Sequence, residues 1–241
     1  MKTLIVPCMG NKKIDGIPQY ILEHPCGKMN LLRSVEGVWS NYYDKLLVVL
    51  GEDDVTKFPV EKIIRDTFKN YPLEIVVLNQ KTNGPAETVY WAIRRAKITG
   101  SIVIKDNDSY IHSEVPEGNF VIGLDLNLWD KDIYNLRNKS FLIINEQKNI
   151  LDIIEKRICS PVISIGLYGF NHVESFMKAY ERLNDSNYPI SGLYISHIIS
   201  YLIGYSNKVF RFVNAMEYET WGSDKLWREL KVEYETNNCR S

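Results

Sequence analysis

Short apolar runs alternate with segments of helical spacing through the first half of the chain. Runs rich in Val, Ile and Leu predict strands over residues 2–7, 45–50, 73–78 and 102–104. Apolar residues three or four positions apart predict helices over residues 31–38, 60–70 and 86–97. Strands that are apolar throughout, and that alternate with helices, are typical of a parallel sheet buried on both faces.

The second half of the chain has a mixed pattern. Further strands are predicted over residues 119–123, 141–145, 150–155, 163–170 and 208–212. Further helices are predicted over residues 173–183 and 193–203. We interpret this half as a mixed α+β extension of the same sheet, because no repeat or linker separates it from the first half. The polar residues 233–241 are expected to form a frayed tail.

Length, charge and cysteine content narrow the class of protein. The 241 residues fit one large α/β domain. Lys and Arg total 29 against 30 Asp and Glu, so no global basic field indicates a nucleic-acid partner. No apolar run is long enough to span a bilayer, and the N-terminus has no signal-peptide pattern. Four cysteines without CxxC spacing are typical of thiols in a reducing compartment, so we expect a cytoplasmic protein with no membrane partner.

The predicted strand over residues 102–104 runs directly into two aspartates, Asp106 and Asp108. Such a strand places carboxylates at the carboxyl edge of the sheet, where open α/β sheets bind ligands. Two carboxylates one residue apart suit Mg²⁺ or Mn²⁺, which are bound by one or two carboxylates together with substrate phosphates. The alternative is that Asp106, Asn107 and Asp108 only build a turn, since Asp and Asn are common turn formers. The segment by itself leaves both interpretations open.

Six segments follow one another in an informative order. They are Pro7-Cys-Met-Gly-Asn-Lys-Lys13, residues 79–89, Asp106-Asn-Asp108, Ile154-Glu-Lys156, Gly166-Leu-Tyr-Gly-Phe170 and Tyr218-Glu-Thr-Trp-Gly-Ser223. In this order and spacing the chain resembles the nucleotide-sugar pyrophosphorylases, or sugar-phosphate nucleotidylyltransferases. The resemblance is greatest to small members found with capsule or polysaccharide genes. It covers nearly the whole chain, although no single segment is specific.

The resemblance implies a Rossmann-like, GT-A-type three-layer α/β sandwich with a mostly parallel, mixed central sheet. Residues 1–112 would form its nucleotide-binding half and residues 113–232 its acceptor-binding half. The implied reaction transfers NMP from an NTP to a sugar phosphate or polyol phosphate and releases pyrophosphate, with Mg²⁺ (or Mn²⁺) as cofactor. CTP and UTP are favoured for a capsule-type relative, but no residue decides the base or the acceptor. A homodimer is left open.

The resemblance also implies which residues bind the nucleotide. The triphosphate loop would consist of Pro7, Met9, Gly10, Asn11 and Lys12, and the segment that contacts the base would consist of Gln80, Asn83, Gly84, Pro85 and Ala86. Gly84 has no side chain to obstruct the base. Glu87 would lie in the first turn of the following helix, where we prefer a capping role for it.

One position in this half departs from the family. A Pro-Lys pair follows the phosphate loop in the family, whereas this chain has Pro18-Gln19. A neutral Gln cannot stabilise charge on the transferred phosphoryl group, so Lys13 and Lys28 are the candidate catalytic cations. A solvated loop is the alternative interpretation of Lys12 and Lys13.

The resemblance assigns the metal and the acceptor to later segments. Asp106 and Asp108 resemble the catalytic and metal-binding aspartate, and which of them aligns is ambiguous. The implied acceptor-binding residues are Tyr110, Glu155, Lys156, Gly169 and Trp221. A Glu-Lys pair is also common on ordinary strands, and Trp221 could equally belong to the core.

The last segment contains a second departure. The family often has a second metal-binding aspartate where this chain has Thr220. Glu219 is a candidate metal ligand beside it, although neighbours on a strand face opposite ways, so Glu219 does not simply replace an aspartate.

Two other functions stay open. Asp106-Asn107-Asp108 is formally a DxD motif, as in GT-A glycosyltransferases. A degenerate, non-catalytic protein that binds nucleotide or sugar phosphate would account for Gln19 and Thr220. The chain contains no GxSxG and no GxGxxG after its first strand, which argues against a serine hydrolase and a dinucleotide-dependent oxidoreductase.

Overall fold

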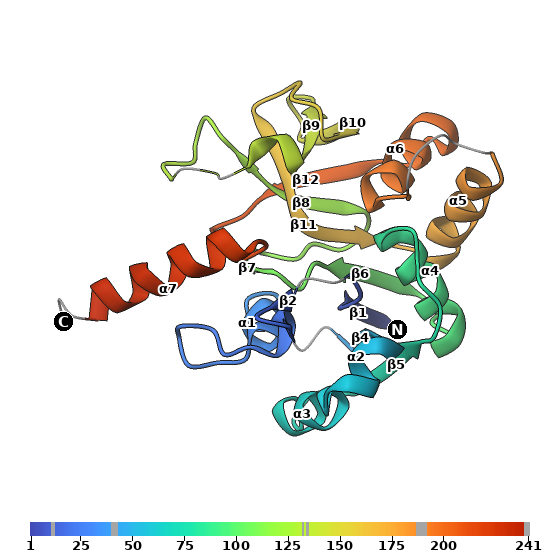
Figure 1. Cartoon of the computed structure of the whole chain (residues 1–241). Helices are drawn as coiled ribbons and strands as arrows, with labels where there is room; N and C mark the ends of the chain where they lie inside the picture. Colours follow the sequence, from blue (N-terminus) through green and yellow to red (C-terminus); the bar gives the residue numbers. More distant parts are fainter. Residues whose placement is uncertain (11–12, 40–42, 132, 134, 187–191, 239–241) are drawn as a thin grey trace.

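The computed structural model describes residues 1–10, 13–39, 43–131, 133, 135–186 and 192–238. Nine strands form one central sheet (Figure 1). They are β1 (Lys2–Pro7), β4 (Lys45–Gly51), β5 (Leu73–Leu78), β6 (Ser101–Lys105), β8 (Phe120–Asp125), β9 (Ser140–Ile144), β10 (Asn149–Glu155), β11 (Val162–Phe170) and β12 (Phe210–Asn214). Their order across the sheet is β5-β4-β1-β6-β11-β8-β12-β10-β9.

The sheet is mixed, as predicted. β5, β4, β1 and β6 are parallel neighbours. β11 is antiparallel to β6 and β8, whereas β12 is parallel to β8. β10 is antiparallel to both β12 and β9. Only β10 and β11 therefore run against the other strands of this sheet. β9 also pairs with β11 through Phe141 and Ile163, so this end of the sheet curls back on itself.

Helices cover both faces of the sheet. They are α1 (Asn30–Glu36), α2 (Glu52–Lys57), α3 (Val60–Thr67), α4 (Pro85–Ala96), α5 (Val173–Asp185), α6 (Ile195–Ser206) and α7 (Asp224–Asn238). α4, α5 and α6 pack on one face, whereas α1 and α3 pack on the other. The result is the three-layer arrangement expected from the sequence.

β1 illustrates why the strands are apolar throughout. Ile5 packs in the cluster under α4, α5 and α6. Leu4 and Val6 pack in the cluster on the opposite face. Because successive side chains of a strand point to opposite faces, a strand covered on both sides needs apolar residues at every position.

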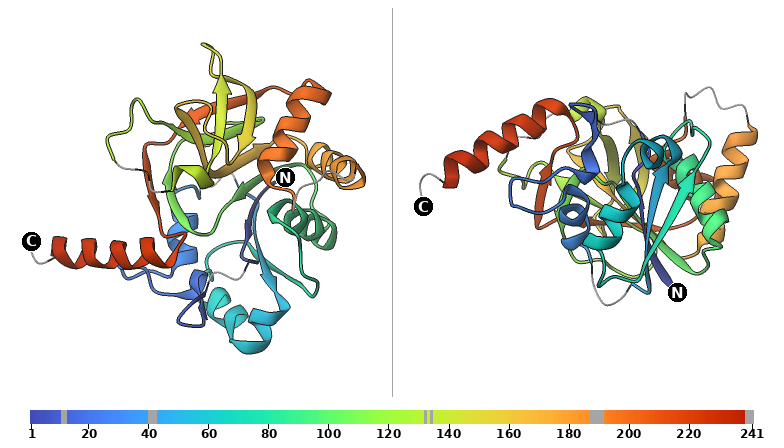
Figure 2. Two further views of the ribbon diagram at one scale, coloured as in Figure 1. Left: turned by 45° about the horizontal axis from the view of Figure 1, so that its top comes forward. Right: turned by 60° about the horizontal axis from the view of Figure 1, so that its bottom comes forward.

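The predicted strands and helices are present, with shifted ends. The sequence pattern missed β2 (Lys13–Ile14), β3 (Ile17–Pro18), β7 (Ser109–His112) and β13 (Glu217–Thr220), of which β7 and β13 form a separate antiparallel pair. It also missed α2 and α7. α7 extends away from the body of the molecule (Figure 2), and residues 233–238, expected to fray, continue this helix. No helix in the described ranges combines the length and the apolar character needed to cross a membrane.

Candidate functional site

A cavity of about 630 Å³ opens at the edge of the sheet where β1, β4, β5 and β6 end. Residues that follow these strands line it, because the carboxyl ends of parallel strands meet at one edge. The structure brings together many of the residues predicted from the sequence to bind substrates or metal. Those in the lining are Pro7, Met9, Gly10, Gln80, Gly84, Pro85, Asp106 and Asp108.

The turn after β6 holds Asp106 and Asp108 against β11. The backbone N–H of Asp106 donates to the carbonyl of Gly166 over 2.8 Å. Gly166 has φ +91°, and a Cβ at this position would collide with the Asp106 carboxylate. The missing side chain of Gly166 therefore makes room for the carboxylate of Asp106.

Lys105 supports the same turn from within the core. Its side chain is fully buried, and its Nζ donates to the carbonyl of Asp106 (2.6 Å) and to the carbonyl (2.8 Å) and hydroxyl (3.0 Å) of Ser109. Burial lowers the pKa of Lys105 to about 8, while Asp106 and Asp108 act in the opposite direction. The Lys105 ammonium therefore does not point to solvent and makes its three hydrogen bonds inside the turn.

Two further groups approach the turn from the other side. Thr220 Oγ1 donates to the carbonyl of Asp108 over 3.2 Å, so the position that departs from the family does lie beside the aspartates. Lys139 Nζ donates to the Tyr218 hydroxyl over 2.7 Å. Burial opposes the charge of Lys139, but Tyr218, Asp108 and Asp106 together raise its pKa. Lys105 and Lys139 therefore both lie within electrostatic range of Asp106 and Asp108.

The loop after β1 lies next to this turn. Asn107 Nδ2 donates to the carbonyl of Pro7 over 2.6 Å. Asn11 and Lys12, predicted to bind phosphate, lie outside the described residues. Lys13 Nζ lies 3.0 Å from Asp54 Oδ1, and Asp54 also accepts a hydrogen bond from the Tyr20 hydroxyl over 3.1 Å. Because Asp54 and Tyr20 both line the cavity, Lys13 sits at its rim.

Gln19, which occupies the position where the family has a lysine, and Lys28, one of the two candidate cations, have other contacts. Gln19 is 3% exposed and lines the cavity, and its Nε2 donates to the carbonyl of Trp221. Its amide therefore joins the segment after β3 to the end of β13. Lys28 is not in the lining, and its Nζ lies 2.6 Å from Glu36 Oε2. The structure thus places Lys28 away from the aspartates.

Solved structures of other proteins share this architecture along nearly the whole chain. A nucleoside-diphosphate-sugar pyrophosphorylase from Vibrio cholerae RC9 is 20% identical, with a TM-score of 0.74 over 96% of this chain and 100% of that chain. An inositol-1-phosphate CTP transferase from T. maritima is 13% identical, with a TM-score of 0.71 over 98% and 96%. HddC from Yersinia pseudotuberculosis is 14% identical, with a TM-score of 0.65 over 97% and 100%.

The chain has the nucleotidylyltransferase fold. No protein-family model and no curated protein matches its sequence. The cavity beside β1 and β6 is lined by three of the six segments in which the sequence resembles the family, namely those at residues 7–10, 79–88 and 106–108, together with residues from other parts of the chain.

The segment that begins α4 supplies a second wall of the cavity. Glu87 lies in the first turn of α4, as expected, and its Oε2 accepts the backbone N–H of Asn83, the residue before the N-cap, over 2.6 Å. A Cβ on Gly84 would collide with the carbonyl of Leu193. The absence of a side chain at Gly84 therefore lets the backbone at Leu193 pack against it. Asn83 is exposed and Ala86 is fully buried, and neither is in the lining.

Glu155 and Lys156, predicted to bind the acceptor, lie at the end of β10 and directly after it. Glu155 Oε2 accepts hydrogen bonds from the hydroxyls of Ser140 (2.5 Å) and Ser196 (2.6 Å). Lys156 Nζ donates to the Tyr194 hydroxyl and lies 4.1 Å from the centroid of that ring. Because Tyr194 lines the cavity, the Glu-Lys pair is brought to its border.

Tyr168 is buried near both Asp106 and Glu155. Burial, and next the Asp106 carboxylate, hold the pKa of Tyr168 well above its usual range, and Glu155 acts in the same direction. This buried phenol therefore lies within electrostatic range of both carboxylates. Sequence reasoning missed Tyr168, Tyr194 and Lys139, because their place in the site depends on contacts between distant segments.

Two predicted acceptor residues belong to the core. Trp221 is fully buried in a cluster with Trp227, so the alternative interpretation of this residue was right. A Cβ on Gly169 would overlap the Phe120 ring, which fills the space beside it. Neither residue lines the cavity.

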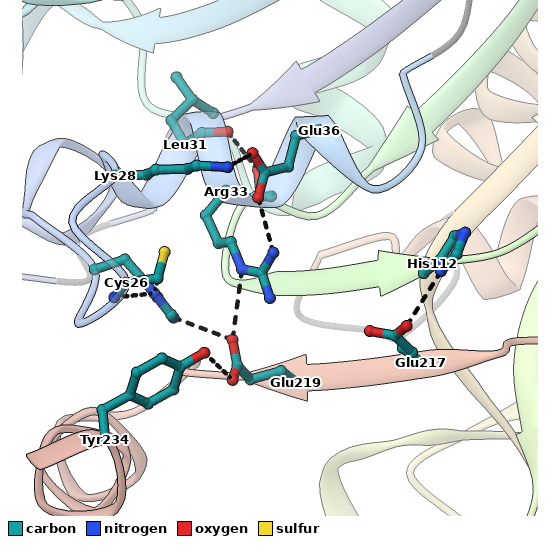
Figure 3. A network of polar contacts seen from close by, with 11 residues as sticks. Cys26, Lys28, Leu31, Arg33, Glu36, His112, Glu217, Glu219 and Tyr234 are labelled. Carbon is teal, nitrogen blue, oxygen red and sulfur yellow. Dashed lines mark hydrogen bonds and ion pairs between the residues drawn. The ribbon is translucent and has the colours of Figure 1, made fainter. Parts of the chain in front are cut away.

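Glu219 lies in a separate polar cluster (Figure 3). Glu219 lies 3.1 Å from His24 Nε2 and 3.7 Å from Arg33 Nε, and it accepts a hydrogen bond from the Tyr234 hydroxyl over 3.0 Å. The Arg33 guanidinium stacks on the Tyr110 ring at 3.5 Å. Among the described residues, no group of three or more His, Cys, Asp or Glu side chains could hold a metal ion. Glu219 therefore does not complete a metal site with Asp106 and Asp108.

Proposed function

We propose that the chain is a metal-dependent nucleotidylyltransferase that transfers NMP from an NTP to a sugar phosphate or polyol phosphate and releases pyrophosphate. The observation that carries this proposal is the aspartate turn, Asp106–Asp108, which faces the loop after β1 across one cavity. The names of two proteins of the same fold, a nucleoside-diphosphate-sugar pyrophosphorylase and an inositol-1-phosphate CTP transferase, support the same reaction class.

The nucleotide would occupy the half of the cavity formed by β1, β5 and α4. Backbone N–H groups of the loop around Gly10 would hold the phosphates, and the base would lie against Gln80 and Pro85. Lys13 would exchange its contact with Asp54 for the triphosphate, which carries more charge. Such positioning aligns the α-phosphorus for in-line attack by the acceptor phosphate.

Asp106 and Asp108 fit Mg²⁺ or Mn²⁺ because their carboxylates are hard oxygen donors at the carboxyl edge of the sheet. A bound divalent ion would neutralise phosphate charge as the bond to pyrophosphate breaks. Lys105 keeps the turn in one conformation through its three hydrogen bonds, so the carboxylates are held in place before the substrates bind.

The acceptor would bind between the aspartate turn and Tyr194. Lys156, already directed at the Tyr194 hydroxyl, would contact the acceptor phosphate. Glu155, fixed by Ser140 and Ser196, would accept hydrogen bonds from acceptor hydroxyl groups at the same border. We further propose that the product supplies capsule or surface polysaccharide synthesis in the cytoplasm, with CTP or UTP as donor and a homodimer as the assembly.

A pyrophosphate-release screen tests this function. It crosses CTP, UTP, GTP, ATP and dTTP with a panel of sugar and polyol phosphates in Mg²⁺ or Mn²⁺. Release that needs one nucleotide, one acceptor and the metal would establish the transferase. If no pair releases pyrophosphate while nucleotides raise the melting temperature, the chain is a binder or a glycosyltransferase that uses a finished sugar nucleotide.

A further inference from the structure

A tight turn places a cysteine thiol against a histidine, outside the cavity described above. The backbone N–H of His24 donates to the backbone carbonyl of Lys28 (2.7 Å), and the backbone N–H of Gly27 donates to the backbone carbonyl of His24 (2.8 Å). Cys26 lies between them with its side chain exposed, whereas His24 is fully buried. Cys26 Sγ lies 3.0 Å from His24 Nδ1.

The contacts of His24 determine which ring nitrogen carries its hydrogen. The Cys26 backbone N–H donates to Nδ1 over 3.2 Å, so Nδ1 acts as an acceptor. A neutral imidazole has one acceptor nitrogen and one donor nitrogen, so the hydrogen lies on Nε2. Nε2 faces Glu219 Oε1 at 3.1 Å. Nδ1 therefore accepts the Cys26 backbone N–H and also stands 3.0 Å from the Cys26 sulfur, so the backbone and the thiol of Cys26 share one acceptor.

Surrounding groups hold this imidazole in place. The rings of Trp221 and Tyr234 meet it edge-on, with centroids 4.9 and 5.5 Å away. Glu219 is itself held by the Tyr234 hydroxyl at 3.0 Å and by Arg33 Nε at 3.7 Å. The order of groups is a nucleophile, a base and a carboxylate 3.1 Å from the second nitrogen of the base, which is the order found in activated nucleophilic side chains.

Two cations lie near these groups. The Lys28 carbonyl closes the turn that holds Cys26, and Arg33 Nε lies 3.7 Å from the Glu219 carboxylate. Figure 3 shows Cys26, Lys28 and Arg33 on the same side of the Glu219 carboxylate.

We propose that Cys26 is a site of thiol–disulfide exchange with low-molecular-weight dialkyl disulfides. The thiol proton passes to His24 Nδ1, and the Cys26 sulfur attacks one sulfur of the disulfide. A new S–S bond forms to Cys26 while the original S–S bond breaks. The other half leaves with the bonding electrons as a thiolate and takes up the proton from the imidazolium. Cys26 is thereby oxidised to a mixed disulfide, and half of the added disulfide is reduced to a thiol.

Cys159 provides a matched comparison within the same chain. Its side chain is also exposed, but burial and Asp152 raise its pKa against the opposing effect of Arg157. Cys8 is buried, and its pKa is raised by that burial. We therefore expect the disulfide to modify Cys26 in preference to Cys159 and Cys8.

The test uses the full chain with Cys239→Ser, so that the thiols compared lie in the described part of the structure. Bis(2-hydroxyethyl) disulfide, which is uncharged, is added at neutral pH, the reaction is quenched with acid, and modified peptides are quantified over time. We expect Cys26 to react about tenfold faster than Cys159. Equal rates, or a faster reaction at Cys159, would overturn the proposal.

A second variant tests the role of the carboxylate. Glu219→Gln removes the charge that orients His24, so the rate at Cys26 should fall several-fold while the rate at Cys159 stays unchanged. A melting curve checks that the variant is folded. An unchanged rate at Cys26 in a folded Glu219→Gln variant would show that His24 and Glu219 do not activate the thiol. If that variant does not fold, Tyr234→Phe, which removes one hydrogen bond to Glu219, is judged by the same two rates.

Discussion

The carboxylate of Asp106 lies against the Cα of Gly166, in space that any side chain at position 166 would fill. Gly166 also accepts the backbone hydrogen bond of Asp106, so the two residues fix each other at the junction of β6 and β11. β11 runs antiparallel to β6 beside it. The position of the proposed metal-binding carboxylate therefore depends on a glycine in the second half of the chain.

Gly166→Ala should displace Asp106 and reduce turnover. The new Cβ meets the carboxylate, and a shift of a proposed catalytic group by about 1 Å can lower kcat by about a hundredfold. The positive φ adds a folding cost of about 1–2 kcal/mol.

Gly118→Ala is the matched control, because Gly118 also has positive φ (+88°) but has open space where a Cβ would lie. Both variants should lose stability in denaturant titrations, and only Gly166→Ala should lose pyrophosphate release beyond that. Equal activity in the two variants would contradict the role given to the Asp106–Gly166 contact.

Thr220→Asp should strengthen metal binding. Thr220 Oγ1 already lies 3.2 Å from the Asp108 carbonyl, so a carboxylate here would stand beside the aspartate turn. We expect half-maximal pyrophosphate release at an Mg²⁺ concentration about tenfold lower. Thr220→Asn, of nearly the same shape but uncharged, should leave the metal requirement unchanged. If Thr220→Asp and Thr220→Asn had the same Mg²⁺ requirement, a carboxylate at position 220 would not contribute to metal binding.

Lys156→Met should weaken acceptor binding more than nucleotide binding. The side chain approaches the cavity through Tyr194, which lines it, whereas Lys156 itself is not in the lining. Loss of one charge-assisted contact should raise KM for the acceptor phosphate about tenfold and leave KM for the NTP unchanged. Lys178→Met, on the exposed face of α5, serves as the control. A rise in KM for the NTP alone would place Lys156 on the nucleotide instead.

The stability that Glu219 contributes should disappear in acid. Burial opposes ionisation of Glu219, but His24, Tyr234 and Arg33 lower its pKa below the usual 4.5. A carboxylate whose pKa is depressed in the folded state stabilises the protein above its unfolded pKa and loses that contribution as pH falls through the folded value. The difference in unfolding free energy between the wild type and Glu219→Gln should therefore be largest above pH 5, and it should shrink as pH falls below about 4.5.

The exposed Glu229, on α7, provides the comparison for this measurement. Glu229→Gln should show little change at any of these pH values. If the difference in unfolding free energy between the wild type and Glu219→Gln grew as pH fell, the effect would have the opposite sign. That result would contradict the contacts assigned to Glu219.

Local pattern was enough to predict the layers of the fold. The apolar runs of β1 and β4 reflect burial on both faces of the sheet. The two strands are parallel neighbours. The strand pair β7–β13 could not be predicted in this way. β7 has only Ile111 fully buried, and its partner strand lies near the other end of the chain.

Residues of the candidate site were predictable from the sequence where they closely follow a strand. Asp106, Asp108 and Gly10 do so, and all three line the cavity. Lys105 and Gln19 are polar residues, yet each is buried and donates to a backbone carbonyl. Their roles depend on where those carbonyls lie in the folded chain, which no local pattern reveals.

The most direct test of the central claim measures metal-dependent pyrophosphate release in Asp106→Asn and Asp108→Asn. Each substitution keeps the shape of the turn and removes one negative charge from the proposed metal site. With the nucleotide and acceptor identified by the screen, we expect at least one variant to lose about 10²–10³ in kcat while its melting temperature stays close to wild type. Asp66→Asn, exposed on α3, should retain full activity. Undiminished release in both Asp106→Asn and Asp108→Asn would show that the aspartate turn is not the catalytic metal site.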